Sequence, residues 1–210
     1  MANLTDLTSK EFLTELASAA PAPGGGGGAA MAGALAAALS SMVCNLTLGK
    51  EKFAAQEAEV QSLLTKAERA RERLLELVQE DAAVFNSFMS CYKLPKATDE
   101  EKAARTAAIR AAAKKAAEVP LAIARESFAV LELADELVVC GNPGVITDGA
   151  CSGLLARAAL RCAEYNVRIN LGLTKDAEWN AQVQAELEAM LTQAEALEAK
   201  LLAVTDKALA

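Results

Sequence analysis

The stretch PAPGGGGGAAMAGALAAALSSMVCNLTLG, residues 21–49, decides how the rest of this chain is arranged. Two prolines end the preceding segment. The five consecutive glycines at residues 24–28 predict a loop, because glycine accepts backbone conformations that other residues avoid. The twenty mostly small residues that follow predict a helix, since alanine is the best helix former. Neighbouring helices can approach such a helix closely on every side, so we expect it to be the central helix of the fold.

A glycine loop that opens onto a helix presents unpaired backbone N–H groups, and the helix dipole favours an anion or a polar ligand atom there. The loop is therefore a candidate binding site made by Gly24, Gly25, Gly26 and Gly27. A plain connection between two helices is the alternative. A dinucleotide-binding loop does not fit, because it needs a preceding β-strand, whereas residues 9–20 have the pattern of a helix.

The apolar run at residues 29–48 has the length of a membrane span. Alanine dominates this run, Ser40, Ser41 and Asn45 interrupt it, and no lysine or arginine cluster flanks it, so its composition argues against membrane insertion. The residues after Met1 do not have the charged and apolar regions of a secretion signal. We therefore expect no membrane partner.

The composition predicts an all-α fold. The 210 residues are enough for one domain, residues 1–210, and few segments are rich in β-branched residues. The formal net charge of −7 argues against nucleic acid as a partner. Five cysteines with no CxxC pair indicate reduced thiols in a cytoplasmic protein. The chain has no histidine, which excludes imidazole catalysis and histidine-ligated metals.

Further helices are expected around the central one, giving a single-domain bundle of long helices. Their predicted ranges are residues 9–20, 54–91, 98–118, 121–140, 149–171 and 176 onward. Pro120 is expected to kink or restart the chain between two of them, and residues 141–144 form a turn. The apolar repeat of the last helix, from Trp179 to Val204, suggests packing on a partner helix, which a second subunit could supply.

Asp81 is the one charged position in an apolar stripe that runs from Leu74 to Phe88. A carboxylate on such a stripe is costly to bury unless a partner satisfies it. Burial would also raise its pKa, as the pKa of a general acid or base must be raised to work near neutral pH. A structural carboxylate satisfied by an arginine or a helix end is an equally good interpretation, and both remain open.

Asp148 follows the turn at residues 141–144, which contains Asn142. We expect Asp148 to cap the helix that begins there, where bonds from backbone N–H groups would keep it ionised. A pure capping role is the commoner one for aspartate in this setting. The turn is longer and richer in special residues than capping requires, which favours a functional role.

Four lysines lie at helix ends or in loops: Lys50, Lys52, Lys93 and Lys96. Most such lysines are simply solvated. A cluster of them near a glycine loop could instead hold a substrate that carries carboxylates. Asn166 and Asn170 lie four residues apart on one predicted helix, and asparagines that are buried need hydrogen-bond partners.

Several short blocks occur in order from residue 12 to about residue 171. They are residues 21–53, DAAVF at 81–85, LPK at 94–96, GN at 141–142, TD at 147–148 and NVRIN at 166–170. Together they resemble the signature of the cyclodeaminase/cyclohydrolase family of folate enzymes. MVCNLT at 42–47 and TDEEKAAR at 98–105 are more similar to its stand-alone methenyltetrahydrofolate cyclohydrolases. Two departures are Gly27, where many members have serine, and the order Gly-Ala-Cys at 149–151.

The resemblance implies an all-helical homodimer that binds folate near the glycine loop without a metal or nucleotide cofactor. The implied reaction is hydrolysis of 5,10-methenyltetrahydrofolate to 10-formyltetrahydrofolate. Release of ammonia by a formimidoyltetrahydrofolate cyclodeaminase is the close alternative, and a helical binding module without activity is the other.

The resemblance also implies roles for particular residues. Asp148 would stabilise the substrate cation and Asp81 would move the proton. The four lysines would bind the glutamate tail of the folate, including polyglutamylated forms, and the glycine amides would bind a pterin or formyl oxygen. Asn45, Asn142 and Asn166 complete the predicted binding set, and no metal ligands are expected.

Overall fold

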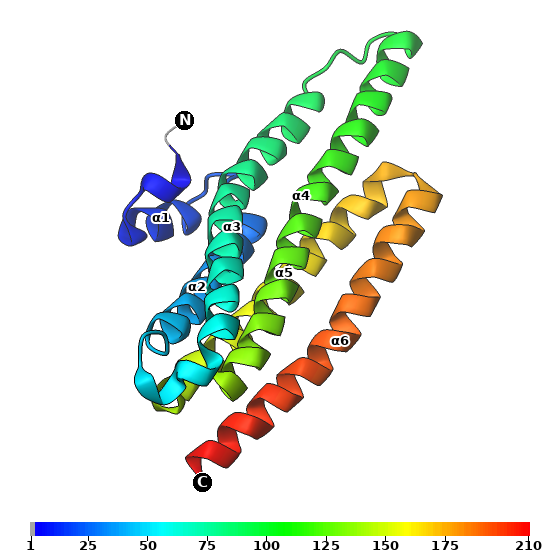
Figure 1. Cartoon of the computed structure of the whole chain (residues 1–210). Coiled ribbons are helices and arrows are strands. Elements are labelled where there is room, and N and C mark those ends of the chain that lie inside the picture. The colour runs from blue at the N-terminus through cyan, green and yellow to red at the C-terminus, as the bar shows by residue number, and fades with distance from the viewer. Residues whose placement is uncertain (1–2) are drawn as a thin grey trace.

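The computed structural model describes residues 3–210 and shows an elongated bundle of helices (Figure 1). The helices are α1 (Ser9–Leu16), α2 (Gly25–Asn45), α3 (Glu57–Cys91), α4 (Asp99–Cys140), α5 (Ile146–Thr174) and α6 (Ala177–Leu209). Short 3-10 turns lie at Leu4–Asp6, Glu51–Gln56 and Pro143–Val145. The prediction of an all-α fold is confirmed.

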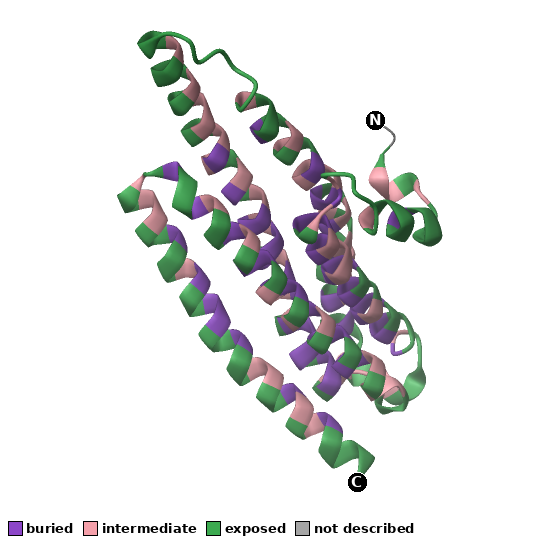
Figure 2. Ribbon diagram, turned by 180° about the vertical axis from the view of Figure 1, so that it is seen from behind, coloured by how far each residue is buried: buried purple, intermediate pink, exposed green. Residues whose placement is uncertain are grey.

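The small residues of α2 let three long helices pack around it. α2 contacts α3, α4 and α5, and its residues Ala30, Ala36 and Ala37 are completely buried. A Cβ atom on Gly33 would lie 3.1 Å from the Leu74 side chain, so α3 approaches α2 closely at that point. Figure 2 shows the buried positions concentrated where these helices face one another. The prediction of a central, small-residue helix is therefore confirmed.

The prediction that all five glycines form a loop is wrong. Only Gly24 precedes the helix, as its extended N-cap residue, and Gly25–Gly28 make up the first turn of α2. The N–H of Gly28 already donates to the carbonyl of Gly24 at 2.9 Å. Glycine costs about 1 kcal/mol relative to alanine in a helix. Here the burial of Gly26 and Gly27 against α3 offsets that cost.

The predicted break at Pro120 is also absent, and α4 runs through it as one helix. Proline has no N–H, so the carbonyl of Ala116 loses its donor within the helix. The side chain of Asn170 on α5 replaces that donor, with its Nδ2 atom 3.0 Å from the Ala116 oxygen. A neighbouring helix therefore supplies the hydrogen bond that the proline removes, which a single-helix pattern does not show.

The prediction that Asp148 is the N-cap of its helix is wrong. α5 begins at Ile146 with Val145 at the N-cap, which places Asp148 within the first turn. A carboxylate there is still favoured by the helix dipole. The capping oxygen in this region belongs to Asn142, whose Oδ1 accepts from the N–H of Gly144 at 3.0 Å.

The apolar stripe of α6 packs on α4 and α5 of the same chain. Leu187 and Leu201 are buried in that contact, and Lys200 on α6 forms an ion pair with the buried carboxylate of Asp135 on α4. The partner helices of this stripe are thus supplied within the chain. Among residues 3–210, α2 is the helix whose length and composition would suffice to cross a membrane, and 61% of its apolar window is buried by its neighbours.

Candidate functional site

A cleft of about 280 Å³ lies at the start of α2, bounded by α2, α3, α4 and α5. Its lining combines backbone and polar groups with aromatic and aliphatic side chains, which is typical of a small-molecule site. The lining residues include Pro21, Gly24, Gly25, Gly26, Asp81, Phe85, Phe88, Ala116, Pro120, Asn166, Ile169, Asn170 and Leu173. A larger hollow over Lys66, Arg69 and Glu132 is lined mainly by mixed charges and lacks this combination.

Asp81 is the titratable group of this cleft. Its position on α3 turns the carboxylate toward the first turn of α2, and its Oδ2 accepts a hydrogen bond from the N–H of Gly27 at 2.9 Å. Burial raises the pKa of the Asp81 carboxyl, and the hydrogen bond from Gly27 offsets part of that rise. A carboxyl with a raised pKa is suited to taking and returning a proton.

Gly26 makes room for that carboxyl. A Cβ atom on Gly26 would lie 2.6 Å from Asp81 Cγ, closer than real Cβ contacts allow. The helix end that satisfies Asp81 is therefore also the start of the cleft. Asp81 is therefore both hydrogen-bonded by a helix end and part of the cleft lining, so the structure is compatible with both interpretations of this residue.

The first turn of α2 and Asn166 provide the other polar groups. Gly25 and Gly26 open the helix, so their N–H groups have no acceptor within it. A Cβ atom on Gly25 would lie 3.4 Å from Asn166 Nδ2, which shows how near α5 comes to this turn. Asn166 itself donates from Nδ2 to the carbonyl of Cys162 at 2.8 Å. The cleft thus offers backbone donors beside amide and carboxylate oxygens.

A second group of predicted residues lies at the opposite end of α2. Asn142 joins the α4–α5 turn to that end: its N–H donates to Thr47 Oγ1 at 2.9 Å, and its Nδ2 donates to the carbonyl of Leu46 at 3.0 Å. Asn45 is the last residue of α2, and Asp148 lies in the first turn of α5, just after the Asn142 turn. Asp148 and Asn166 are 18 positions apart on α5, which is about 27 Å along a helix. Within one chain, Asp148 is therefore not in the cleft with Asp81.

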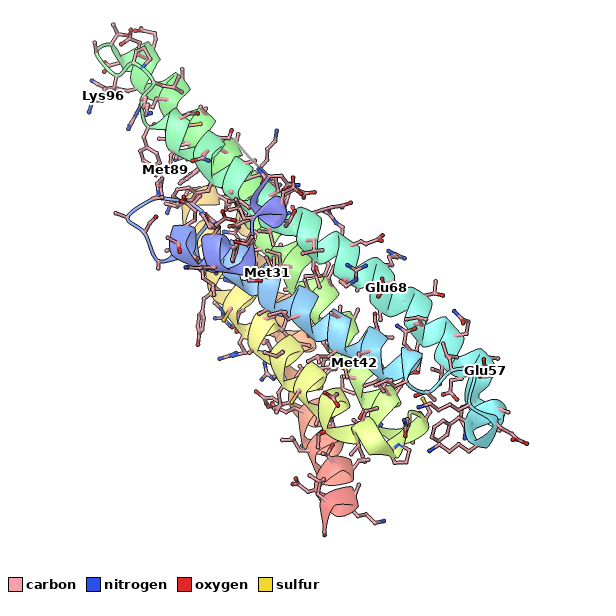
Figure 3. The ribbon with its side chains drawn as sticks, turned by 90° about the vertical axis from the view of Figure 1, so that its left-hand side faces the viewer. Met31, Met42, Glu57, Glu68, Met89 and Lys96 are labelled. Carbon is pink, nitrogen blue, oxygen red and sulfur yellow. The ribbon has the colours of Figure 1, made fainter. Side chains whose placement is uncertain are left out.

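The four predicted lysines are divided between the two ends of the bundle. All are exposed; Lys93 and Lys96 lie in the α3–α4 loop, and Lys50 and Lys52 precede α3. The 35-residue α3 separates these pairs by about 50 Å. Figure 3 shows Lys96 at one end of the molecule and Glu57, the first residue of α3, at the other. One ligand tail cannot reach both pairs in a single chain.

Several lining residues were not predicted as site residues. Phe85 and Phe88 share the α3 stripe with Asp81 at spacings of four and seven, so extending that stripe would have found them. Asn170 could have been found in the same way, four positions after Asn166. Pro120 gave no such signal, because its place in the cleft depends on how α4 packs on α5.

Comparisons with known proteins find relatives over most of this chain. Residues 8–189 match the model of the formiminotransferase-cyclodeaminase family. A methenyltetrahydrofolate cyclohydrolase of Methylorubrum extorquens is 45% identical over 90% of this chain and 91% of its own length. The formimidoyltransferase-cyclodeaminase of Sus scrofa is 33% identical over 88% of this chain, which spans 34% of that protein.

A solved structure shows the same architecture. The crystal structure of formiminotetrahydrofolate cyclodeaminase from Thermotoga maritima superposes with a TM-score of 0.88 at 28% sequence identity. The match covers 99% of this chain and 100% of that one. With the matched family model and the 45% identical relative, these similarities show that the chain belongs to the formiminotransferase-cyclodeaminase family.

Proposed function

We propose that this protein is a methenyltetrahydrofolate cyclohydrolase that converts 5,10-methenyltetrahydrofolate and water to 10-formyltetrahydrofolate. The observation that carries the proposal is the Asp81 carboxyl, which has a raised pKa and lines a cleft at the start of a helix. The name and near-full-length match of the Methylorubrum extorquens relative support this choice of reaction.

The reaction needs one group that takes a proton and then returns it. The bridging carbon of the substrate lies in a cationic N–C–N unit. The oxygen of a water molecule bonds to that carbon while the Asp81 carboxylate takes a proton from the water. The hydroxyl group of this adduct then gives up its remaining proton to solvent as the bond between the carbon and N5 breaks, and Asp81 returns its proton to N5. The formyl group stays on N10, the product is 10-formyltetrahydrofolate, and Asp81 ends as it began.

The first turn of α2 supports this proton transfer in two ways. The N–H of Gly27 holds one oxygen of Asp81, which fixes the direction of the other. The N–H groups of Gly25 and Gly26 supply donors for an oxygen atom of the ligand, either of the pterin or of the formyl group.

We also propose that the protein works as a homodimer formed through the outer face of α2 and α5. α2 has no charged residue over its whole length, and its outer positions include the exposed Leu35 and Met42. Beside it, α5 exposes Leu154, Tyr165 and Ile169. Figure 3 shows the two helices side by side, with Met31 and Met42 along α2. An exposed face of this kind is typical of a protein interface.

A two-fold axis near the middle of α2 would give the second group of residues a role. It would place the end of α2 in one copy beside the start of α2 in the other, as in any isologous antiparallel contact. The Asn45, Asn142 and Asp148 group of one copy would then complete the cleft of the other, with Asp148 beside the substrate cation. Leu35→Glu should convert the dimer to a monomer in sedimentation velocity, and an unchanged mass would contradict this face.

The reaction proceeds with neither metal nor organic cofactor. A chain without histidine has no histidine-ligated metal site, and turnover should survive dialysis against a chelator. Lys93 and Lys96, at the end of α3 beyond the cleft, bind the glutamate tail of mono- or polyglutamylated folate.

The free state of the five cysteines supports a cytoplasmic location, and the net charge of −7 supports the absence of a nucleic-acid partner.

The test is the absorbance decay of 5,10-methenyltetrahydrofolate in a buffer where its spontaneous hydrolysis is slow. We expect the purified protein to accelerate formation of 10-formyltetrahydrofolate and Asp81→Asn to lose most of that acceleration. The Thermotoga maritima structure favours cyclodeamination as the second candidate. Ammonia release from 5-formiminotetrahydrofolate, without hydrolysis of the methenyl compound, would establish it. Inactivity in both assays would indicate a binding module.

A further inference from the structure

Asn170 is bound to the one carbonyl that Pro120 leaves without a helical donor. Its Nδ2 lies 3.0 Å from the Ala116 oxygen on α4 and 2.8 Å from the Asn166 oxygen on its own helix. All four residues line the same cleft as Asp81. The joint between α4 and α5 is therefore part of the wall of the site.

These two contacts fix the orientation of the Asn170 amide. Both partners are carbonyl oxygens, which only accept, so the NH₂ group must face them and the Oδ1 atom cannot. Both N–H bonds of the amide are committed in this way. What Asn170 has left to offer a ligand is the oxygen, as a hydrogen-bond acceptor of fixed orientation.

We propose that Asn170 determines specificity in this cleft by accepting a hydrogen bond from an N–H group of the pterin ring. The inference rests on the proposed folate substrate. The pterin carries an amino group and ring N–H groups that can donate, whereas the glutamate tail ends in carboxylates that an oxygen atom would repel. The apolar side chains of Phe85, Ile169 and Leu173 in the same cleft fit a flat ring better than a charged tail.

Asn170 also positions the cleft through its bond to α4, and the two roles can be separated. In Pro120→Ala, residue 120 regains an N–H that can donate to the Ala116 carbonyl, so losing Asn170 no longer leaves that carbonyl without a donor. The anchoring role of Asn170 then becomes small, while its acceptor toward the ligand is still missing. The experiment compares wild type, Asn170→Ala, Pro120→Ala and the double variant.

Asn180 provides a matched control. Its Nδ2 donates to the carbonyl of Leu171 at 2.9 Å and its Oδ1 accepts from Thr174 Oγ1 at 2.7 Å, so it also ties a helix end through its amide. It does not line the cleft. Asn180→Ala should therefore lower the melting temperature without raising KM.

For Asn170→Ala we expect a lower melting temperature and a rise in KM for 5,10-methenyltetrahydrofolate of about tenfold, as the loss of one hydrogen bond implies, with kcat changed less. In the Pro120→Ala background the melting-temperature loss should shrink and the rise in KM should persist. If the rise in KM disappears together with the melting-temperature loss, Asn170 is structural only and the proposal is wrong. An unchanged KM in both backgrounds would also overturn it.

A binding measurement keeps this result separate from the proposed reaction. If the wild type does not hydrolyse the methenyl compound, the same proteins are titrated with tetrahydrofolate by calorimetry. Weaker binding by Asn170→Ala in both backgrounds supports the pterin contact even though the reaction assignment has failed. Equal binding by all variants, or none by the wild type, refutes the contact.

Discussion

The two ends of α2 differ in how their polar groups are used. At the start of the helix, the N–H of Gly27 donates to the half-buried carboxylate of Asp81. The cleft beside it also contains backbone N–H groups without a helical acceptor. At the other end, the Asn142 side chain donates from Nδ2 to the carbonyl of Leu46 and accepts at Oδ1 from the N–H of Gly144. The glycine end has polar groups available to a ligand within its own chain, whereas the Asn142 side chain at the other end closes a turn. This difference is why we place the chemistry at the glycine end.

The strongest test of this comparison is to change one carboxylate at each end. Asp81→Asn removes the proton acceptor and should lower kcat by about a hundredfold or more, a typical general-base effect. The amide can still accept from Gly27, so the fold should persist, which circular dichroism would check. Asp148→Asn should lower kcat only if a second copy brings that residue to the cleft. Full activity of Asp148→Asn in a folded dimer would restrict the site to the glycine end.

Gly26→Ala sharpens the comparison at the cleft itself. The added methyl group would displace the Asp81 carboxyl, and a displacement of about 1 Å can cost about a hundredfold in rate. Overpacking of this kind also destabilises a fold by about 1–3 kcal/mol. Gly172→Ala is the matched control, because its Cβ would meet no atom within 4 Å. Urea titration and steady-state kinetics of both variants measure the two effects, and equal kcat values would contradict the crowding argument.

At the opposite end, Asn142→Ala should destabilise the turn of its own chain. It removes the hydrogen bond to the Leu46 carbonyl and the acceptor for Gly144, and loss of a capping side chain costs about 1 kcal/mol. The free energy of unfolding from urea titration checks this value. A much larger drop in kcat/KM than in stability would show that this end contributes to catalysis through the dimer.

The smallest expected effect is a pH dependence of stability that belongs to Asp81. Its folded pKa is raised, so its protonated form is favoured by folding and its contribution to stability is lost as pH rises through that pKa. Asp81→Asn should therefore gain stability relative to wild type as pH increases from 4 to 8. Melting temperatures across that range test it, and a constant difference would mean that the carboxyl is not desolvated. The ionised base is needed for catalysis, so kcat should rise over the same interval.

Local patterns in the sequence predict the long helices, the central place of α2 and the singular position of Asp81. They fail where a partner from another helix decides the outcome. The glycine turn is helical with Gly26 and Gly27 buried and Asp81 of α3 bonded to it. α4 continues through Pro120, and Asn170 donates to the Ala116 carbonyl there. The separation of Asp81 from Asp148 is likewise invisible in a list of motifs, since it depends on the length and direction of α2 and α5. The catalytic roles of both residues stay predictions.

The four glycines in the first turn of α2 have a consequence for motion. A glycine costs about 1 kcal/mol of helix stability relative to alanine, and burial offsets that cost only at Gly26 and Gly27, so the exposed Gly25 leaves this turn more prone to local unfolding than the rest of the helix. Every such opening breaks the bond between Gly27 and Asp81 and widens the entrance to the cleft. Amide hydrogen exchange at Gly26 and Gly27 should accordingly be fast in the free protein and slow when folate is bound. The first turn of α2 would then control entry of the ligand to the cleft as well as line it.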